Sequence, residues 1–334
     1  MPQTSSGTRT VKILAIDGGG VRGLIPALIL AEVEKRCAKP VWQLFDVVAG
    51  TSNGAVMTML LTRPEPHSAA EVVSIYSDHC GEFFRRSFLR RVASLDGWLR
   101  PKYPAAAIES TLKRYIGESA ELKNALVEVV ACAYSLRARW PRVELLSRHA
   151  ARSRPGCNFK MWEVARASCA APGYFPGPTI TSTDGRRTIH TIDGGVYAND
   201  PAVVGLTHAI SLEPDKDALI DGRVEHLLVS VGTGFHDEPI VPQHSRNWGL
   251  LGWAPRLIDV MFEGQADLAS REVEQLLAGS RSFRRQWRLQ VGLSRAYALD
   301  DISAANIAFL EESTAKFIAD RNLEIDAMCK ELVV

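Results

Sequence analysis

The chain has 334 residues, of which 46% are hydrophobic and 23% are charged, and its formal net charge is +1. This balance is typical of a globular protein with a sizeable core, and it carries no overall bias toward nucleic acid or anionic membranes. No apolar run reaches the roughly 18 residues of a membrane-spanning helix, and residues 1–10 lack the apolar core of a signal peptide. We therefore expect a cytoplasmic protein with a flexible N-terminal tail at 1–10.

The cysteines and histidines do not indicate a metal site. The six cysteines contain no C-x-x-C pair, and the histidines do not cluster with them at zinc-ligand spacing. We expect reduced structural thiols, with no metal and no cofactor.

The first four predicted elements repeat one pattern. Val11–Ile16 is β-rich and stops at a run of glycines, and Leu24–Cys37 has helical periodicity. Phe45–Ala49 is again strand-like, stops at Gly50, and is followed by the helix-like Ala55–Leu61. Two successive strand–turn–helix units predict a parallel sheet covered by helices.

The rest of the chain extends this architecture. Residues 65–120 are mainly helical and more basic, which indicates a cap or insertion. Strands are predicted at Glu128–Tyr134, Thr188–Ile192, His226–Val231 and Trp287–Val291, and helices at Met161–Ala170 and within Asn306–Leu332. Because the sequence contains no internal repeat and no long linker, we predict a single domain over 11–334. Its fold class is α/β, a three-layer sandwich with a mostly parallel central sheet flanked by helices.

A candidate nucleophile lies at the second strand-to-helix turn. Residues 50–54 (GTSNG) fit G-x-S-x-G and place Ser52 between a strand and a helix. Gly50 and Gly54 remove side chains that would clash in so tight a turn, and the helix N-terminus favours developing negative charge. A structural turn with an N-capping serine is the alternative.

The glycine loop after the first strand can hold an anion. Gly18, Gly19 and Gly20 leave backbone N–H groups that can converge on one negative charge, and Arg22 can orient the loop or form a helix-start ion pair. A nucleotide phosphate loop would need a lysine at the helix start. The G-x-G-x-x-G spacing of a dinucleotide site is met formally, with Gly23 as its last glycine. The third use is an oxyanion hole for acyl transfer.

Asp193 is the candidate base. It ends the predicted strand Thr188–Ile192 and precedes Gly194, whereas none of the eight histidines lies at a comparable glycine-bounded turn. An aspartate can accept the serine proton if burial raises its pKa toward neutrality. An aspartate that only shapes the turn is the alternative.

Three motifs together resemble the signature of patatin-like phospholipases: residues 17–23 (DGGGVRG), 50–54 (GTSNG) and 193–195 (DGG). Residues 165–177, 199–202 and 230–234 are also similar to family segments, and the resemblance spans about 11–300.

The resemblance implies a Ser52–Asp193 dyad without a catalytic histidine, and an oxyanion hole on the backbone of Gly18, Gly19 and Gly20. Arg22, Gly50, Gly54 and Gly194 would support this site. It further implies cleavage of membrane phospholipid esters through an acyl-enzyme. Asn53 and Ala55 depart from the residues usual in the family, a change expected to modulate the turn only.

Two features concern partners. Residues 83–91 (FFRRSFLRR) interleave aromatics with Arg85, Arg86, Arg90 and Arg91, which suits an interfacial patch at the inner membrane, a site for ligand phosphates, or a merely solvated helix face. Residues 248–267 and 299–301 resemble a bacterial branch of the family that includes anti-phage effectors. That resemblance implies a cyclic di- or trinucleotide activator, although the sequence contains no nucleotide motif. The apolar 248–262 segment suits a homo-oligomer interface or core packing.

Two other functions compete with the lipid acyl hydrolase. One is a soluble carboxylesterase with a histidine base such as His226 or His236. The other is a catalytically inert nucleotide-binding or scaffold protein.

Overall fold

The computed structural model describes residues 8–84, 100–137, 142–236, 246, 248–279, 282–295 and 298–334, and its centre is an eight-stranded mixed sheet. The strand order is β5-β6-β3-β2-β1-β7-β9, with β4 also paired to β3. The strands are β1 (Arg9–Ile16), β2 (Val47–Thr51), β3 (Glu128–Ser135), β4 (Val143–Ser147), β5 (Thr179–Thr181), β6 (Thr188–Asp193), β7 (Val224–Val231) and β9 (Phe283–Leu289). β8 (Phe235–His236) and β10 (Gly292–Leu293) form a separate pair.

The strands β3, β2, β1, β7 and β9 run parallel to one another, whereas β4 and β6 are antiparallel to β3. The carboxyl ends of the parallel strands therefore meet at one edge of the sheet, where ligand sites of α/β proteins form. Because β6 is antiparallel to β3, its last residue, Asp193, lies opposite Ala133 of β3.

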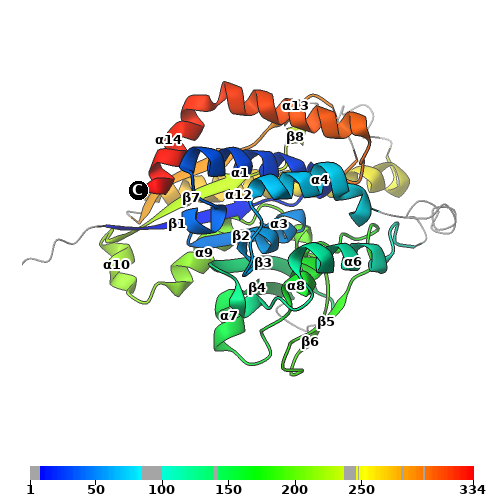
Figure 1. Ribbon diagram of the computed structural model, residues 1–334, viewed down its shortest axis with the longest axis horizontal. Helices are drawn as coiled ribbons and strands as arrows, with labels where there is room; N and C mark the ends of the chain where they lie inside the picture. The colour runs from blue at the N-terminus through cyan, green and yellow to red at the C-terminus, as the bar shows by residue number, and fades with distance from the viewer. Residues whose placement is uncertain are drawn as a thin grey trace, which may run out of the picture.

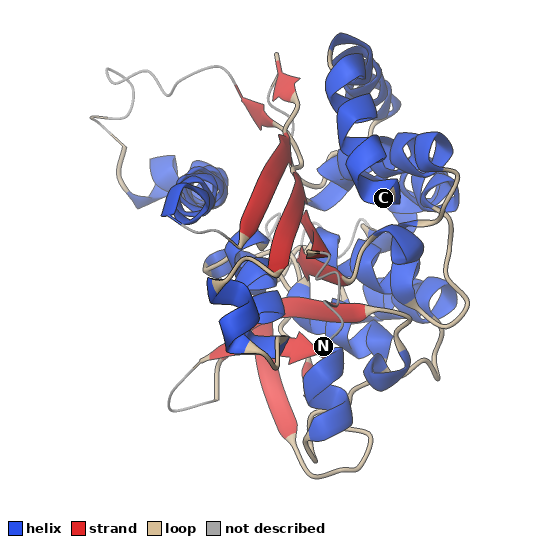
Figure 2. Cartoon of the chain, turned by 90° about the vertical axis from the view of Figure 1, so that its left-hand side faces the viewer, coloured by secondary structure: helices blue, strands red, loops and turns tan. Residues whose placement is uncertain are grey.

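Helices cover both faces of the sheet (Figures 1 and 2). On one face α1 packs against α4, α13 and α14, and α3 packs against β2 and α8. On the other face α9 packs on β1 and β2, and α12 packs on β9 and α9. The helices are α1 (Leu24–Cys37), α2 (Val41–Leu44), α3 (Asn53–Thr62), α4 (Ala69–Phe83), α6 (Ala105–Ile116), α7 (Arg148–Ser153), α8 (Met161–Ser168), α9 (Ala202–Leu212), α10 (Lys216–Ile220), α12 (Leu250–Gly279), α13 (Ala304–Asp320) and α14 (Asn322–Val333), with short 3-10 turns η1 (Gly20–Gly23), η3 (Leu122–Asn124) and η4 (Gly194–Val196).

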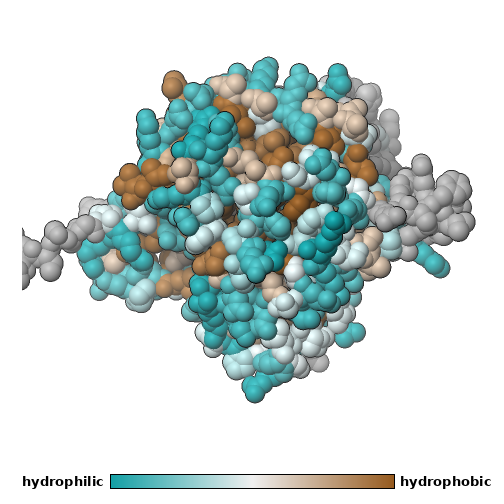
Figure 3. All heavy atoms as spheres, viewed as in Figure 1, coloured by the Kyte–Doolittle hydropathy of each residue, from teal (hydrophilic) through white to brown (hydrophobic). Residues whose placement is uncertain are grey.

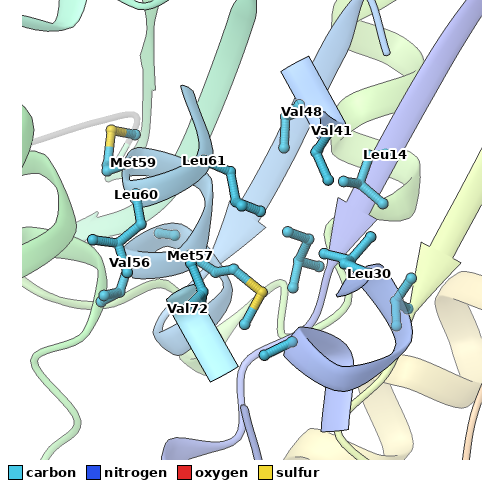
Figure 4. Close-up of a cluster of buried hydrophobic side chains, with 14 of the residues drawn as sticks. Leu14, Leu30, Val41, Val48, Val56, Met57, Met59, Leu60, Leu61 and Val72 are labelled. Carbon is cyan, nitrogen blue, oxygen red and sulfur yellow. The ribbon is translucent and has the colours of Figure 1, made fainter. Parts of the chain in front are cut away.

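The larger core lies between the sheet and α1, α3 and α4 (Figure 4). Leu14 and Val48 point from the strands toward Leu30 of α1 and Met57 of α3. Every residue of α3 is buried, and a helix that is buried all round holds its first residue in a fixed position. This is the helix that begins directly after Ser52.

The predicted fold class is confirmed. The first predicted strand and helix appear as β1 and α1, and the second strand and helix appear as β2 and α3. The strands predicted at Thr188–Ile192 and His226–Val231 appear as β6 and β7. The last predicted strand is displaced: β9 covers Phe283–Leu289 rather than Trp287–Val291. Several elements were not predicted from the sequence, among them β4, β5, α9 and α12.

Other predictions concern the surface and the domain limits. The face seen in Figure 3 is mainly hydrophilic with hydrophobic residues between. Among the described helices, none combines the length and apolarity that crossing a bilayer requires. The extent of the domain stays a prediction, as does the cap at 65–120, where α4 and α6 pack on α1, α3 and α8. The arginine patch, Arg85, Arg86, Arg90 and Arg91, lies outside the described residues.

Candidate active site

Ser52 occupies a strained turn between β2 and α3. Its backbone has φ 54° and ψ −121°, a conformation that non-glycine residues seldom adopt. The turn is held against its surroundings: a Cβ on Gly54 would lie 2.0 Å from the carbonyl oxygen of Ile16, and one on Gly50 would lie 2.5 Å from the oxygen of Gly54. Only glycine fits at these two positions, so the sequence can form this turn and lift the serine hydroxyl off the sheet.

The Ser52 hydroxyl faces Asp193. Ser52 Oγ donates a 2.7 Å hydrogen bond to Asp193 Oδ2, and the Gly195 N–H donates one of 2.7 Å to Asp193 Oδ1. Asp193 is 1% exposed and Ser52 7%. Burial raises the pKa of Asp193 to about 7, although the hydrogen bonds from Gly195 and Ser52 lower it. A carboxylate with this pKa can exchange a proton with the serine near neutral pH.

Strand β3 sets the distance between these two residues. In the parallel pairing of β2 with β3, Thr51 lies opposite Cys132, and in the antiparallel pairing of β3 with β6, Asp193 lies opposite Ala133. Adjacent residues of β3 therefore hold the strand ends that carry the serine and the aspartate. Gly194 completes the fit, because a Cβ there would lie 2.2 Å from the Cys132 carbonyl oxygen.

The glycine loop lies beside Ser52, but one of its three N–H groups is occupied. The Gly18 N–H donates to the Asn199 carbonyl oxygen at 3.0 Å. No hydrogen bond joins the N–H of Gly19 or Gly20 to another described residue. Gly18 has no room for a side chain, since a Cβ would lie 3.0 Å from Ser52 Cβ. The loop therefore offers two backbone donors, Gly19 and Gly20, where the sequence analysis expected three.

An apolar pocket, partly open to solvent, begins at Ser52. Its lining comes from α3, α4, α6, the segment after α8, α12 and the loop before α13. The lining residues are Gly20, Ser52, Asn53, Val56, Tyr76, Cys80, Phe83, Phe84, Ile108, Cys169, Ala171, Tyr174, Phe175, Phe262 and Leu299. An elongated apolar group such as an acyl chain suits this wall chemistry.

The other predicted residues lie apart from the serine. Arg22 is buried in η1, with Nη1 3.2 Å from His236 Nε2. His226 is buried on β7, where its Nδ1 lies 3.0 Å from the Ser282 carbonyl oxygen. Both candidate histidine bases thus have other partners, while the serine hydroxyl donates to an aspartate. Within the described parts of the chain, no group of three His, Cys, Asp or Glu residues is arranged to hold a metal.

Two supports of the site were not predicted from the sequence. The Ser52 N–H donates to Ser168 Oγ at 2.9 Å, and that hydroxyl donates to the Cys132 carbonyl oxygen at 2.6 Å. Phe262 of α12 lies over the glycine turn that follows Asp193, because a Cβ on Gly195 would lie 2.9 Å from its ring. Ser168 and Phe262 both lie in stretches already noted for their resemblance to the family, 165–177 and 248–267, but neither residue was singled out there.

An α/β sandwich with a serine on a strand-to-helix turn, a buried carboxylate and an apolar cavity defines a serine acyl hydrolase. The family described as Patatin-like phospholipase matches residues 14–205, and the chain belongs to this family.

Individual relatives agree with this assignment. The chain is 29% identical to Patatin-like protein 4 of Arabidopsis thaliana, over 92% of this chain and 83% of the relative. It is 30% identical to Patatin-like protein 1 of Oryza sativa subsp. indica, over 80% of this chain and 70% of the relative. Among solved structures it is similar to VipD from Legionella pneumophila, with 12% identity over 96% of this chain and 69% of that one and a TM-score of 0.38.

Proposed function

We propose that the protein is a phospholipase-type lipid acyl hydrolase in which Ser52 is the nucleophile and Asp193 its base. The observation that carries the proposal is the 2.7 Å hydrogen bond from Ser52 Oγ to Asp193 Oδ2 at the start of an apolar cavity. The buried carboxylate has a pKa raised to about 7, so it is both ionised and basic enough to act near neutral pH.

The reaction then has two halves. Asp193 takes the proton of Ser52 while Ser52 Oγ attacks the ester carbonyl carbon, and the N–H groups of Gly19 and Gly20 stabilise the oxyanion. When the oxyanion collapses, the alcohol leaves with the proton held by Asp193, and the acyl group remains on Ser52. Asp193 next takes a proton from water as that water attacks the acyl-enzyme, and Ser52 leaves as a hydroxyl with the returned proton.

The cavity supports a lipid as substrate. Its lining is aromatic and aliphatic, so a fatty acyl chain can be buried beside the serine with little polar surface left unpaired. For a bilayer substrate, the protein would act as a peripheral enzyme on the cytoplasmic face of the inner membrane. Cell fractionation tests this location: the amount of the protein in the membrane fraction is compared with the amount in the soluble fraction.

Labelling with a fluorophosphonate probe, combined with hydrolysis of defined phospholipids, tests the proposed chemistry. Wild type should be labelled and should release fatty acid, and Ser52→Ala should do neither. A matched control is Ser74→Ala, since Ser74 lies on the exposed side of α4 and only bonds back to Ala70. Labelling of Ser52→Ala at the wild-type rate would contradict the proposal.

Two competing functions give different results. A histidine-dependent esterase would lose activity in His226→Gln or His236→Gln and keep it in Asp193→Asn. An inert binding or scaffold protein would not be labelled in any form. The proposed dyad requires the reverse pattern, in which only Ser52 and Asp193 are essential.

Activation by a cyclic oligonucleotide is a finer part of the proposal, supported only by the resemblance of residues 248–267 and 299–301 to nucleotide-activated relatives. Titration of the purified protein with cyclic dinucleotides and trinucleotides, while fatty acid release is followed, tests it. Full activity that no nucleotide changes would contradict it. Light scattering with and without the nucleotide tests for a homo-oligomer.

A further inference from the structure

A buried ion-pair cluster centred on Arg288 of β9 lies behind the glycine loop. Arg288 Nη1 is 3.0 Å from Asp17 Oδ1 and Nη2 is 2.6 Å from Asp17 Oδ2, so the pair is bidentate. Arg288 Nη1 also donates to Ser230 Oγ at 2.6 Å and lies 3.2 Å from Asp200 Oδ2. The three charged side chains are 18%, 2% and 0% exposed, for Arg288, Asp17 and Asp200 respectively.

The two aspartates belong to the two chain segments that meet at Gly18. Asp17 directly precedes Gly18, and Asp200 directly follows Asn199, whose carbonyl oxygen accepts the Gly18 N–H at 3.0 Å. The guanidinium of Arg288 therefore bridges the segment that begins the glycine loop and the segment that follows the Asp193 turn. Strand β9, through Arg288, thus fixes how these two segments lie relative to each other.

The charges of the cluster show what the arginine does. Burial raises the pKa of Asp17 to about 7, Arg288 lowers it, and the nearby Asp200 carboxylate raises it. Without the guanidinium, two buried carboxylates would face each other with no cation between them. Such a pair keeps one shared proton until the pH is high enough to remove it, and the two negative charges then repel.

We propose that Arg288 is a positioning residue, which holds the glycine loop against the Asn199–Asp200 segment so that the Gly19 and Gly20 N–H groups face the oxyanion. Its effect on hydrolysis rests on the proposed function, whereas its effect on the two carboxylates does not. Arg288 is absent from the lining of the acyl cavity. Its loss should therefore lower kcat and leave KM nearly unchanged.

The test compares Arg288→Gln with wild type over pH 6 to 9. At pH 6 Asp17 still holds its proton, so we expect a moderate loss of kcat. At pH 9 Asp17 has lost its proton and has no cation beside it, so the loop is displaced, and a misplacement of about 1 Å can lower the rate by about 100-fold. The other groups facing the cluster are Ser230, which does not titrate in this range, and Cys132, whose pKa burial raises to about 11. The change in charge between pH 6 and 9 should therefore come from Asp17.

Stability provides a readout independent of activity. A carboxyl with a raised pKa in the folded state retains its proton when the unfolded chain has lost it, so stability falls as pH rises up to the folded pKa. In wild type this fall should end near pH 7. In Arg288→Gln it should continue above pH 7, because the contribution that lowers the pKa of Asp17 has been removed. Urea unfolding at each pH measures this difference.

Three further variants make the result decisive. Arg285→Gln is the matched control, since Arg285 is exposed on the same strand and pairs with Glu331, and it should behave as wild type. Arg288→Lys keeps the charge and should keep the wild-type pH profile with a lower kcat. The double change Arg288→Gln with Asp200→Asn leaves one carboxylate and should recover activity at pH 9 to within about 10-fold of wild type.

Distinct outcomes separate this inference from the proposed function. If wild type hydrolyses no ester but Arg288→Gln loses stability above pH 7, the ion-pair bridge is supported and the proposed function is wrong. If Arg288→Gln loses activity equally at every pH, and the double variant recovers nothing, the positioning role is wrong even though the enzyme is active. An Arg288→Gln protein as active as the Arg285→Gln control at all pH values would also overturn it.

Discussion

Replacing Asp193 by asparagine should stabilise the protein at alkaline pH while it abolishes hydrolysis. Burial raises the pKa of Asp193 from 3.8 to about 7, a shift of about three units. Each pKa unit corresponds to about 1.4 kcal/mol, so holding this carboxylate ionised in the fold costs up to about 4 kcal/mol. Asparagine removes that cost and can still accept the Gly195 N–H.

The effect depends on pH in a defined direction. Between pH 4 and 7 the unfolded chain has released the Asp193 proton and the folded protein retains it, so wild-type stability falls as pH rises through this window. Asp193→Asn lacks this contribution. The difference in free energy of unfolding between variant and wild type should therefore be small at pH 4 and grow toward about 4 kcal/mol at pH 8.

Urea denaturation followed by tryptophan fluorescence at pH 4, 6 and 8 measures this difference, and kcat/KM for a chromogenic ester is measured in parallel at pH 6 and 8. Wild-type kcat/KM should rise with pH to a plateau, with an apparent pKa near 7, because only ionised Asp193 can act as base. Equal stability of the two proteins at pH 8, or a wild-type rate independent of pH from 5 to 8, would refute the reasoning.

Three further predictions concern other positions. Gly54→Ala should unfold the turn or abolish activity, because its Cβ would lie 2.0 Å from a backbone oxygen, whereas Gly264→Ala, on an open face of α12, should stabilise the protein by about 1 kcal/mol in thermal unfolding. Val56→Phe should fill part of the acyl cavity and shift hydrolysis from long-chain to short-chain esters in a chain-length series. Ser168→Ala leaves the buried Ser52 N–H unpaired, so stability should fall by about 1–3 kcal/mol and fluorophosphonate labelling should slow.

The local features of the fold were predictable because they depend on neighbouring residues. The apolar run of β1, the helical period of α1 and the glycines around Ser52 all act within a few positions. The strand β4, Val143–Ser147, was missed because it ends without the glycine turn that marks the equally short Phe45–Ala49. The apolar segment 248–262 was interpreted as an interface or as core packing, and no helix was predicted there, although α12 begins at Leu250.

The chemistry of the site was predictable in part for the same reason. Ser52 and Asp193 were found because each follows a strand and is flanked by glycine. The hydrogen bond that occupies the Gly18 N–H could not be predicted. Its acceptor, the Asn199 carbonyl oxygen, is 181 positions away, and the bond depends on how two loops meet. The position of Arg288 could not be predicted either. Arg284 and Arg285 on the same strand are exposed, and only the fold brings Arg288 to Asp17 and Asp200.

The register of β3 has a consequence for folding. Ser52 and Asp193 are 141 residues apart, and they meet only when β3 has paired with β2 on one side and with β6 on the other. Contacts of such long sequence separation form late, because chain closure must come first. In a refolding experiment the serine should therefore regain reactivity after the helical signal and the compact core have returned. A covalent serine probe applied at successive refolding times would then report completion of the whole sheet.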